Sequence, residues 1–213
     1  MLKCAAAGHR ALCLGQGEEL CWVREPRPLS AVQVIDIFRR KTAPAFEVAL
    51  KLGAIYSGAD EETLEVLEQY SEALGIGYQI KDDLEDFSNP LDPADAKALR
   101  PSLLLAVAHE RADKQQKPTL DQVWRRQVRY EDIAGQIEKL VVELKADERA
   151  RGLLDSYKEE AVRSLRLLEN ASLKGLLRRV MTKIFNDLTV KEWCSEFEAR
   201  NAPGGEVGAA AVG

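Results

Sequence analysis

Apolar residues recur at spacings of three and four along almost the whole chain, and alternation of apolar with polar residues is almost absent. Spacings of three and four place side chains on one face of an α-helix, whereas alternation is typical of a half-buried β-strand. The pattern therefore predicts an all-α fold. With 213 residues, 46% of them hydrophobic, the chain is long enough to bury a core without disulfides or structural metal ions.

Prolines and capping residues set the limits of the first two predicted helices. The first is expected from Leu2 to Val23, because prolines follow at positions 26 and 28. The second is expected from Ala31 to Tyr56, with Ser30 as its N-cap residue. Pro44 lies inside this second helix, and a proline interrupts the hydrogen bonding of a helix. We therefore expect the second helix to be bent or split.

The remainder of the chain divides in the same way. Asp60 is expected to cap a third helix, from Glu61 to about Phe87, and Pro101 to open a fourth, because proline is favoured at the first helical position. Further helices are predicted over residues 119–145, 146–169, 172–188 and 189–200. We interpret residues 1–200 as one helical domain and the Gly- and Ala-rich residues 201–213 as a disordered tail.

Charge and cysteine content narrow the classes of function. The formal net charge is −5, whereas surfaces that bind nucleic acid usually carry a basic excess. No apolar run approaches the ~20 residues that a membrane-spanning helix needs. The four cysteines form no Cys-x-x-Cys pair and only two histidines are present, so a structural zinc site is not expected. We predict a cytoplasmic protein with reduced thiols that binds no nucleic acid and has no membrane span.

An acidic motif in the third predicted helix gives the strongest chemical signal. Asp82 and Asp86 are four residues apart and share a helix face, and Asp83 borders that face. Converging carboxylates attract a hard divalent cation. Mg²⁺ suits a site with few carboxylates, because water and substrate phosphates complete its coordination shell. An acidic, solvated helix surface is the alternative explanation of the same motif.

Polar residues that suit an anion lie near this motif or upstream of it. Gln79 precedes Asp82 by three residues, on the same side of the helix, and its amide can donate to a phosphate oxygen. Lys41 and Thr42, beside Pro44, offer a positive charge and a hydroxyl donor. The simpler explanations are a solvent-facing lysine and a threonine that hydrogen-bonds its own helix backbone.

Taken in order, these motifs resemble the core of the trans-isoprenyl diphosphate synthases, also called polyprenyl synthetases. The elements that carry the resemblance are Lys41-Thr42, Gly53-Ala54, Gly58-Ala59 and Gly77-Tyr78-Gln79-Ile80-x-Asp82-Asp83-x-x-Asp86. Gly15-Gln16 is similar to the family's Gly-Gln-x-x-Asp element, with Glu19 in place of the aspartate. Lys97 begins an element similar to Lys-x-Thr-x-Pro, with Leu99 in place of the threonine.

The resemblance implies a fold, a reaction and roles for individual residues. The fold would be part of the helical bundle of isoprenoid synthases. The reaction would be prenyl transfer from an allylic diphosphate to isopentenyl diphosphate in isoprenoid biosynthesis, with Mg²⁺ as cofactor. Lys41 and Gln79 would act in catalysis. The implied metal ligands are Asp82, Asp83 and Asp86, and the implied diphosphate-binding residues are Gln16, Lys41, Thr42, Gln79 and Lys97.

The chain departs from the family pattern at its beginning. Family members carry a first Asp-Asp-x-x-Asp motif upstream of the Gly-Gln element, which here occupies positions 15 and 16. We therefore expect the chain to carry only the half-site for the allylic diphosphate and Mg²⁺, and to be weakly active or inactive by itself.

Several explanations of this departure stay open. The chain is a truncated gene product, or it works in an oligomer with a second copy or another helical prenyl synthase subunit, or it is a non-catalytic regulatory or structural partner. An unrelated helical scaffold with an acidic surface is the alternative from a different class of protein.

Overall fold

The computed structural model describes residues 1–88 and 100–186, and these are almost entirely helical. They form eight α-helices and one 3₁₀ turn, with no strand in the described part of the chain. The elements are α1 (Leu2–Arg24), α2 (Ala31–Tyr56), α3 (Glu61–Ser88), α4 (Leu103–Arg111), α5 (Lys117–Trp124), α6 (Tyr130–Glu143), α7 (Ala146–Ser164), η1 (Leu165–Leu167) and α8 (Ala171–Phe185). The predicted all-α fold class is confirmed.

The chain separates into two compact units, one from Met1 to Ser164 and a second that begins at Leu165. Within the second unit, Asn170 caps α8 by accepting a hydrogen bond from the backbone N–H of Leu173 at 2.9 Å. The helix predicted over residues 189–200 and the tail predicted over 201–213 lie outside the described residues. The predicted domain 1–200 therefore stays a prediction.

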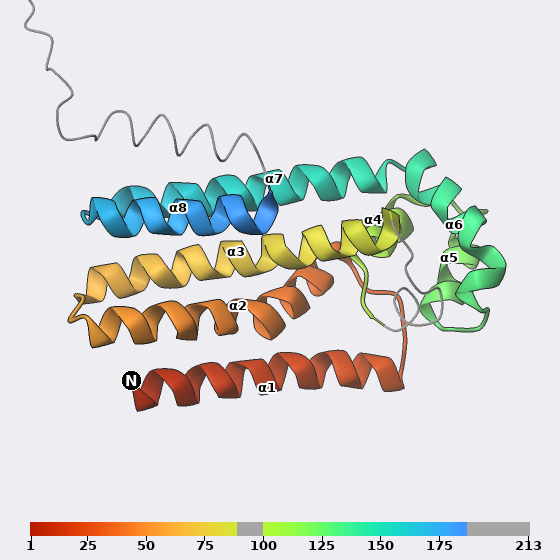
Figure 1. The fold of residues 1–213 in the computed structure, drawn as a ribbon. Helices are drawn as coiled ribbons and strands as arrows, with labels where there is room; N and C mark the ends of the chain where they lie inside the picture. Colours follow the sequence, from red (N-terminus) through yellow and green to blue (C-terminus); the bar gives the residue numbers. More distant parts are fainter. Residues whose placement is uncertain (89–99, 187–213) are drawn as a thin grey trace, which may run out of the picture. The chain divides into compact units, whose positions relative to one another are not determined.

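Three long helices form one side of the first unit. Helix α2 packs against both α1 and α3, and α3 also packs against α7. Figure 1 shows α1, α2 and α3 running side by side, with a clear bend in α2. The bend fits the position of Pro44 inside α2, since proline cannot continue the helical hydrogen bonding. The bend predicted from the sequence is thus present, and its cause is the proline.

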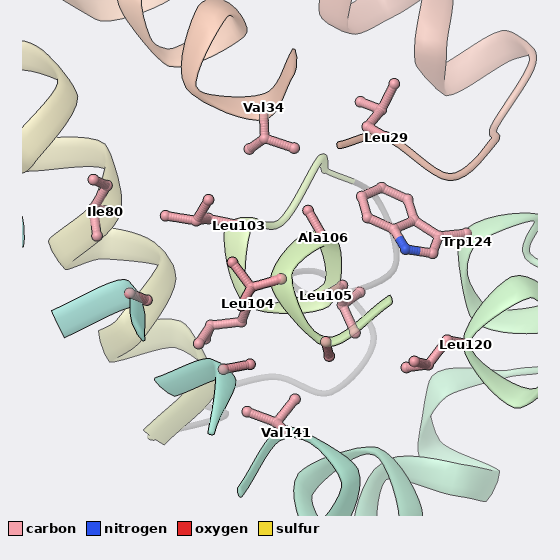
Figure 2. Packing of buried hydrophobic residues seen from close by; sticks show 14 of the residues in the cluster. Leu29, Val34, Ile80, Leu103, Leu104, Leu105, Ala106, Leu120, Trp124 and Val141 are labelled. Atoms are coloured by element: carbon pink, nitrogen blue, oxygen red, sulfur yellow. The ribbon is translucent and has the colours of Figure 1, made fainter. Parts of the chain in front are cut away.

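Helix α4 lies at the centre of the hydrophobic core. Six consecutive residues of α4, from Leu103 to Ala108, are buried. Figure 2 shows side chains from α2, α3, α5 and α6 around this helix, among them Val34, Ile80, Leu120, Trp124 and Val141. A helix that is apolar on all sides needs neighbours on all sides. Helices α2, α3, α5, α6 and α7 supply them.

The predicted N-terminal caps of α2 and α3 are confirmed. Ser30 forms a capping box with Gln33: the Ser30 hydroxyl accepts from the Gln33 N–H at 3.2 Å, and the Gln33 side chain accepts from the Ser30 N–H at 2.9 Å. Asp60 accepts a hydrogen bond from the Thr63 N–H at 2.8 Å, and hydrogen bonds from the Thr63 side chain and then from its backbone lower the pKa of the Asp60 carboxyl. Both caps satisfy N–H groups that have no partner within the helix.

The start predicted for the fourth helix is wrong. Helix α4 begins at Leu103, not at Pro101, and Ser102 is its N-cap residue. The Ser102 hydroxyl accepts from the Leu105 N–H at 3.3 Å. A serine is a strong N-cap, and its side chain fixes the start of the helix two residues after the proline.

The single helix predicted over residues 119–145 is also wrong, because the chain turns between α5 and α6. Arg126 adopts a positive φ of 54° in this turn. Its guanidinium lies 5.3 Å from the centre of a Trp22 ring and donates to the Val23 carbonyl at 3.3 Å. These contacts with α1 are absent from any local pattern, so helical periodicity alone could not reveal the break. The helix predicted over residues 146–169 similarly ends at Ser164 and continues as η1.

No helix in the described ranges is both long and apolar enough to cross a membrane.

Because α4 is enclosed by the core, shortening one of its side chains should destabilise the protein strongly. We expect Leu104→Ala, at a site only 1% exposed, to lower the free energy of unfolding by about 2–5 kcal/mol. Leu20→Ala on α1, where the side chain is 55% exposed, is the control and should change it by no more than about 0.5 kcal/mol. Urea unfolding followed by circular dichroism measures both. Equal urea midpoints for the two variants would contradict the placement of α4.

Candidate functional site

Residues of α2, α3 and the segment that leads into α4 line one cavity in the first unit. Five of the predicted site residues contribute to it: Lys41, Gln79, Asp82, Asp83 and Asp86. The other lining residues are Phe38, Phe87, Arg100, Pro101, Ser102 and Leu105. The structure therefore brings a lysine of α2 to the same cavity as the acidic motif of α3, about forty positions later in the sequence. The chemical roles of these residues stay predictions.

Asp82 and Asp86 present two carboxylates to this cavity from successive turns of α3. Asp82 is half-buried and Asp86 is exposed. Burial, and then the negative charge of Asp86, raise the pKa of the Asp82 carboxyl. Both effects arise because a carboxylate is poorly solvated here and lies beside a like charge. A cation bound between the two would remove the repulsion.

Asp83 is used differently from its two neighbours. Its Oδ2 accepts hydrogen bonds from the backbone N–H groups of Leu103 at 2.7 Å and Leu104 at 3.1 Å, and from the Ser102 hydroxyl at 3.2 Å. Burial raises the pKa of the Asp83 carboxyl to about 6, although these three hydrogen bonds act in the opposite direction. Asp83 thus ties α3 to the N-terminus of α4.

This arrangement bears on the predicted metal site. Within residues 1–88 and 100–186, no three His, Cys, Asp or Glu side chains are grouped as ligands of one metal ion. Mg²⁺ does not require such a cage, because one or two carboxylates and substrate phosphates are its usual partners. Asp82 and Asp86 fit that requirement as hard oxygen donors on one cavity wall.

Lys41 forms an ion pair with Glu19 of α1 at the edge of the site. The Lys41 Nζ lies 2.9 Å and 3.1 Å from the two carboxylate oxygens of Glu19. Glu19 is only 6% exposed, so the lysine holds a charge that would otherwise be buried alone. The Gln16 amide donates to the same carboxylate at 3.3 Å. Glu19, which stands where the family pattern has aspartate, thus holds the ammonium group of a lysine that lines the cavity.

The structure does not bring all predicted site residues to the cavity. Gln16 is exposed, and its described contact is with Glu19. Thr42 is half-buried and is not among the residues that line the cavity. Lys97 lies outside the described residues. The diphosphate contacts predicted for these three residues therefore stay predictions.

Comparison with known proteins places this arrangement in a family. The family model for polyprenyl synthetase matches residues 1–141, which contain every residue of the cavity. The chain belongs to the polyprenyl synthetase family. The family resemblance expected from the motifs is therefore confirmed.

Curated relatives of this polyprenyl synthetase family member are prenyl diphosphate synthases. Geranylgeranyl diphosphate synthase of Methanosarcina mazei is 25% identical over 175 residues, which cover 79% of this chain and 52% of the relative. Heptaprenyl diphosphate synthase component 2 of Geobacillus stearothermophilus is 29% identical over 147 residues, which cover 66% of this chain and 44% of the relative. The chain thus spans about half the length of these relatives.

Solved structures of the family show the same fold. A polyprenyl synthase from Roseobacter denitrificans matches with a TM-score of 0.77 at 21% identity, over 90% of this chain and 62% of that one. A geranylgeranyl pyrophosphate synthase from Corynebacterium glutamicum, complexed with isoprenyl diphosphate and magnesium, matches with a TM-score of 0.70 at 22% identity, over 85% of this chain and 54% of that one. The expected helical bundle of isoprenoid synthases is confirmed as the fold.

Arg100 lines the cavity although no sequence motif predicted it as a site residue. It is exposed, it lines the cavity with Lys41, and its positive charge acts to lower the pKa of Asp82. The sequence signal was its place beside Pro101, within the element that begins at Lys97. An arginine fork is well matched to phosphate oxygens. The cavity is thus lined by a second positively charged side chain besides Lys41.

If the Asp83 carboxylate caps α4, replacing this residue should make the protein less stable. We expect Asp83→Ala to lower the free energy of unfolding by about 1–2 kcal/mol, because two N–H groups of α4 lose their acceptor. Asp83→Asn keeps an acceptor oxygen and should retain most of the stability. Asp86→Ala, at an exposed carboxylate of the same motif, is the control. Urea unfolding distinguishes them, and an Asp83→Ala variant as stable as Asp83→Asn would refute the capping role.

Proposed function

We propose that this chain binds the diphosphate group of an allylic substrate, with Mg²⁺, as part of a prenyl diphosphate synthase. The reaction is prenyl transfer from an allylic diphosphate to isopentenyl diphosphate in isoprenoid biosynthesis. The observation that supports it is the shared cavity, which is lined by two carboxylates and the Gln79 side chain of α3 together with a lysine of α2. Family membership supports the same class of reaction.

Each residue of the cavity has a distinct part in this proposal. Asp82 and Asp86 hold the magnesium ion, and Gln79 donates to a phosphate oxygen. When bound, Mg²⁺ supplies positive charge that stabilises the leaving diphosphate. Lys41, which Glu19 orients, contacts the same diphosphate. Lys41 and Gln79 together are the catalytic residues of this proposal. The charge that develops on the leaving group is thus met by groups already in place.

The apolar part of the cavity suits the other end of such a substrate. Phe38, Phe87 and Leu105 line it beside the polar residues. Their side chains offer a hydrocarbon surface to an isoprenoid chain and keep water away from the reacting carbon. A cavity with carboxylates, cationic side chains and aromatic rings on its walls matches an allylic diphosphate, which has a charged end and an apolar end.

A partner subunit is part of this proposal. One relative is a component of a heptaprenyl diphosphate synthase, and the chain covers 44% of that relative. We propose that the chain works in an oligomer, either with a second copy of itself or with another helical prenyl synthase subunit. A non-catalytic regulatory or structural subunit of such an oligomer is the second candidate function. The cytoplasmic location expected from the sequence stays a prediction.

Binding of diphosphate should depend on Mg²⁺ and on Asp82. We expect inorganic diphosphate to bind at least tenfold more tightly with Mg²⁺ than without it, because the ion joins carboxylate to phosphate. Asp82→Ala should abolish this difference. Glu85→Ala is the matched control, since Glu85 lies on the same helix, pairs with Lys81 at 2.7 Å and is not among the lining residues.

Isothermal titration calorimetry measures these affinities, with circular dichroism to verify that each variant is folded. If the folded wild-type protein shows no Mg²⁺-linked binding, the acidic face is only a solvated surface. If Glu85→Ala loses the Mg²⁺ effect as fully as Asp82→Ala, the ion is held by general negative charge and not by the cavity.

Arg100 should contribute to the same affinity. We expect Arg100→Gln to weaken Mg²⁺-dependent diphosphate binding about tenfold, the size typical for loss of one charge-assisted hydrogen bond. Arg100→Lys should fall between wild type and Arg100→Gln, because lysine keeps the charge and lacks the fork. Arg10→Gln changes an exposed arginine of α1 that is not part of the cavity, and should leave the titration unaltered. Equal affinities for Arg100→Gln and Arg10→Gln would remove Arg100 from the site.

A further inference from the structure

The turn of α2 that carries Lys41 and Thr42 lies immediately before Pro44. Pro44 has no N–H group, so it cannot donate to the carbonyl of Arg40 one turn earlier. Helix α2 bends in this region (Figure 1). The turn from Arg40 to Ala43 is therefore weakened as a helix, and contacts with neighbouring helices must hold it.

A glycine of α1 lies directly against this turn. A methyl group on Gly15 would be 2.6 Å from the Arg40 carbonyl oxygen and 2.6 Å from the Lys41 amide nitrogen. Carbon atoms in favourable contact with their neighbours lie about 3.5–4.0 Å away. The atoms in question belong to the backbone, so no side-chain rotation relieves the overlap. Helix α1 can approach α2 this closely only because residue 15 has no side chain.

A second glycine lies against the same turn from α3. A methyl group on Gly75 would be 2.6 Å from the Cα atom and 2.8 Å from the amide nitrogen of Ala43. The turn is thus in close contact with two helices, each through a glycine. Gly15 precedes Glu19 by one helical turn, and Gly75 precedes Gln79 by one helical turn. Gly15 is therefore one turn from Glu19, which pairs with Lys41, and Gly75 is one turn from Gln79, which lines the same cavity as Lys41.

At three other glycines of the described helices, the backbone of a neighbouring helix does not come this close. Among the described residues, nothing lies within 4 Å of a methyl group placed on Gly17 of α1 or on Gly152 of α7. A methyl group on Gly8 of α1 would overlap the Cγ2 atom of Val48 on α2, which is a side-chain atom, and would lie 3.6 Å from the Pro44 carbonyl oxygen. Close backbone contact with α2 in this region falls on the turn that carries Lys41.

We propose that Gly15 and Gly75 are positioning residues, which hold the Arg40–Ala43 turn at the depth where Lys41 reaches both Glu19 and the diphosphate cavity. A methyl group at either position would push the turn outward and carry the ammonium group away from Gln79 and Asp82. The effect on binding runs through Lys41. The inference rests on the proposed diphosphate function of the cavity.

The test compares Gly15→Ala and Gly75→Ala with two matched controls, Gly17→Ala and Gly152→Ala. Titration calorimetry with inorganic diphosphate and Mg²⁺ gives the affinity, and urea unfolding gives the stability. We expect the affinity to fall at least tenfold in Gly15→Ala and Gly75→Ala. Both controls should bind as wild type and unfold at an equal or higher urea concentration, because alanine is the better helix former.

A double variant tests whether Gly15 acts through Lys41. Lys41→Gln alone should weaken binding, and adding Gly15→Ala should weaken it little further, because the group being positioned is already absent. A full additional loss in the double variant would overturn the proposal, since Gly15 would then act on another part of the site.

The remaining outcomes are also decisive. Wild-type affinity in folded Gly15→Ala and Gly75→Ala would overturn the positioning role. Loss of folding in both, with folded controls, would overturn it too, because the glycines would then serve the stability of the bundle. Absence of Mg²⁺-linked binding in the wild-type protein would instead remove the proposed function, and with it this inference.

Discussion

Helix α4 constrains the whole first unit, because six consecutive residues of it are apolar and buried. Such a helix is stable only when other helices exclude water from every side. It therefore fixes where the described parts of α2, α3, α5 and α6 can lie (Figure 2). At the beginning of α4, Asp83 and Ser102 accept from its free backbone N–H groups. Near its end, the Glu110 side chain accepts from the N–H of Ala31 at 2.8 Å and so ties α4 to the start of α2.

The core and the candidate site consequently share a residue. Asp83 belongs to the acidic motif, yet its Oδ2 caps the buried helix instead of leaving all three carboxylates of the motif for a cation. The two remaining carboxylates and the cations around them define the cavity. Lys41 is held by Glu19 before any ligand arrives. A site arranged in this way loses little order on binding, which is the physical basis of preorganised electrostatic stabilisation.

Much of this architecture followed from the sequence because it depends on local physics. Helical periodicity gave the fold class, and the side chains of Ser30 and Asp60 gave the helix starts, since a cap needs only residues three positions away. Pro44 predicted the bend for the same reason. The break between α5 and α6 was missed, because it depends on contacts of Arg126 with Trp22 and Val23, about one hundred positions earlier.

By itself the sequence determined the family, the class of fold and the two sets of residues that would have to meet, one around Lys41 and one around Asp82. Only the tertiary structure decided that they do meet, that Arg100 joins them, and that Asp83 serves α4. The reason is that a motif specifies which groups one helix face carries. Which face of another helix lies opposite depends on packing, here on a proline bend in close contact with Gly15 and Gly75.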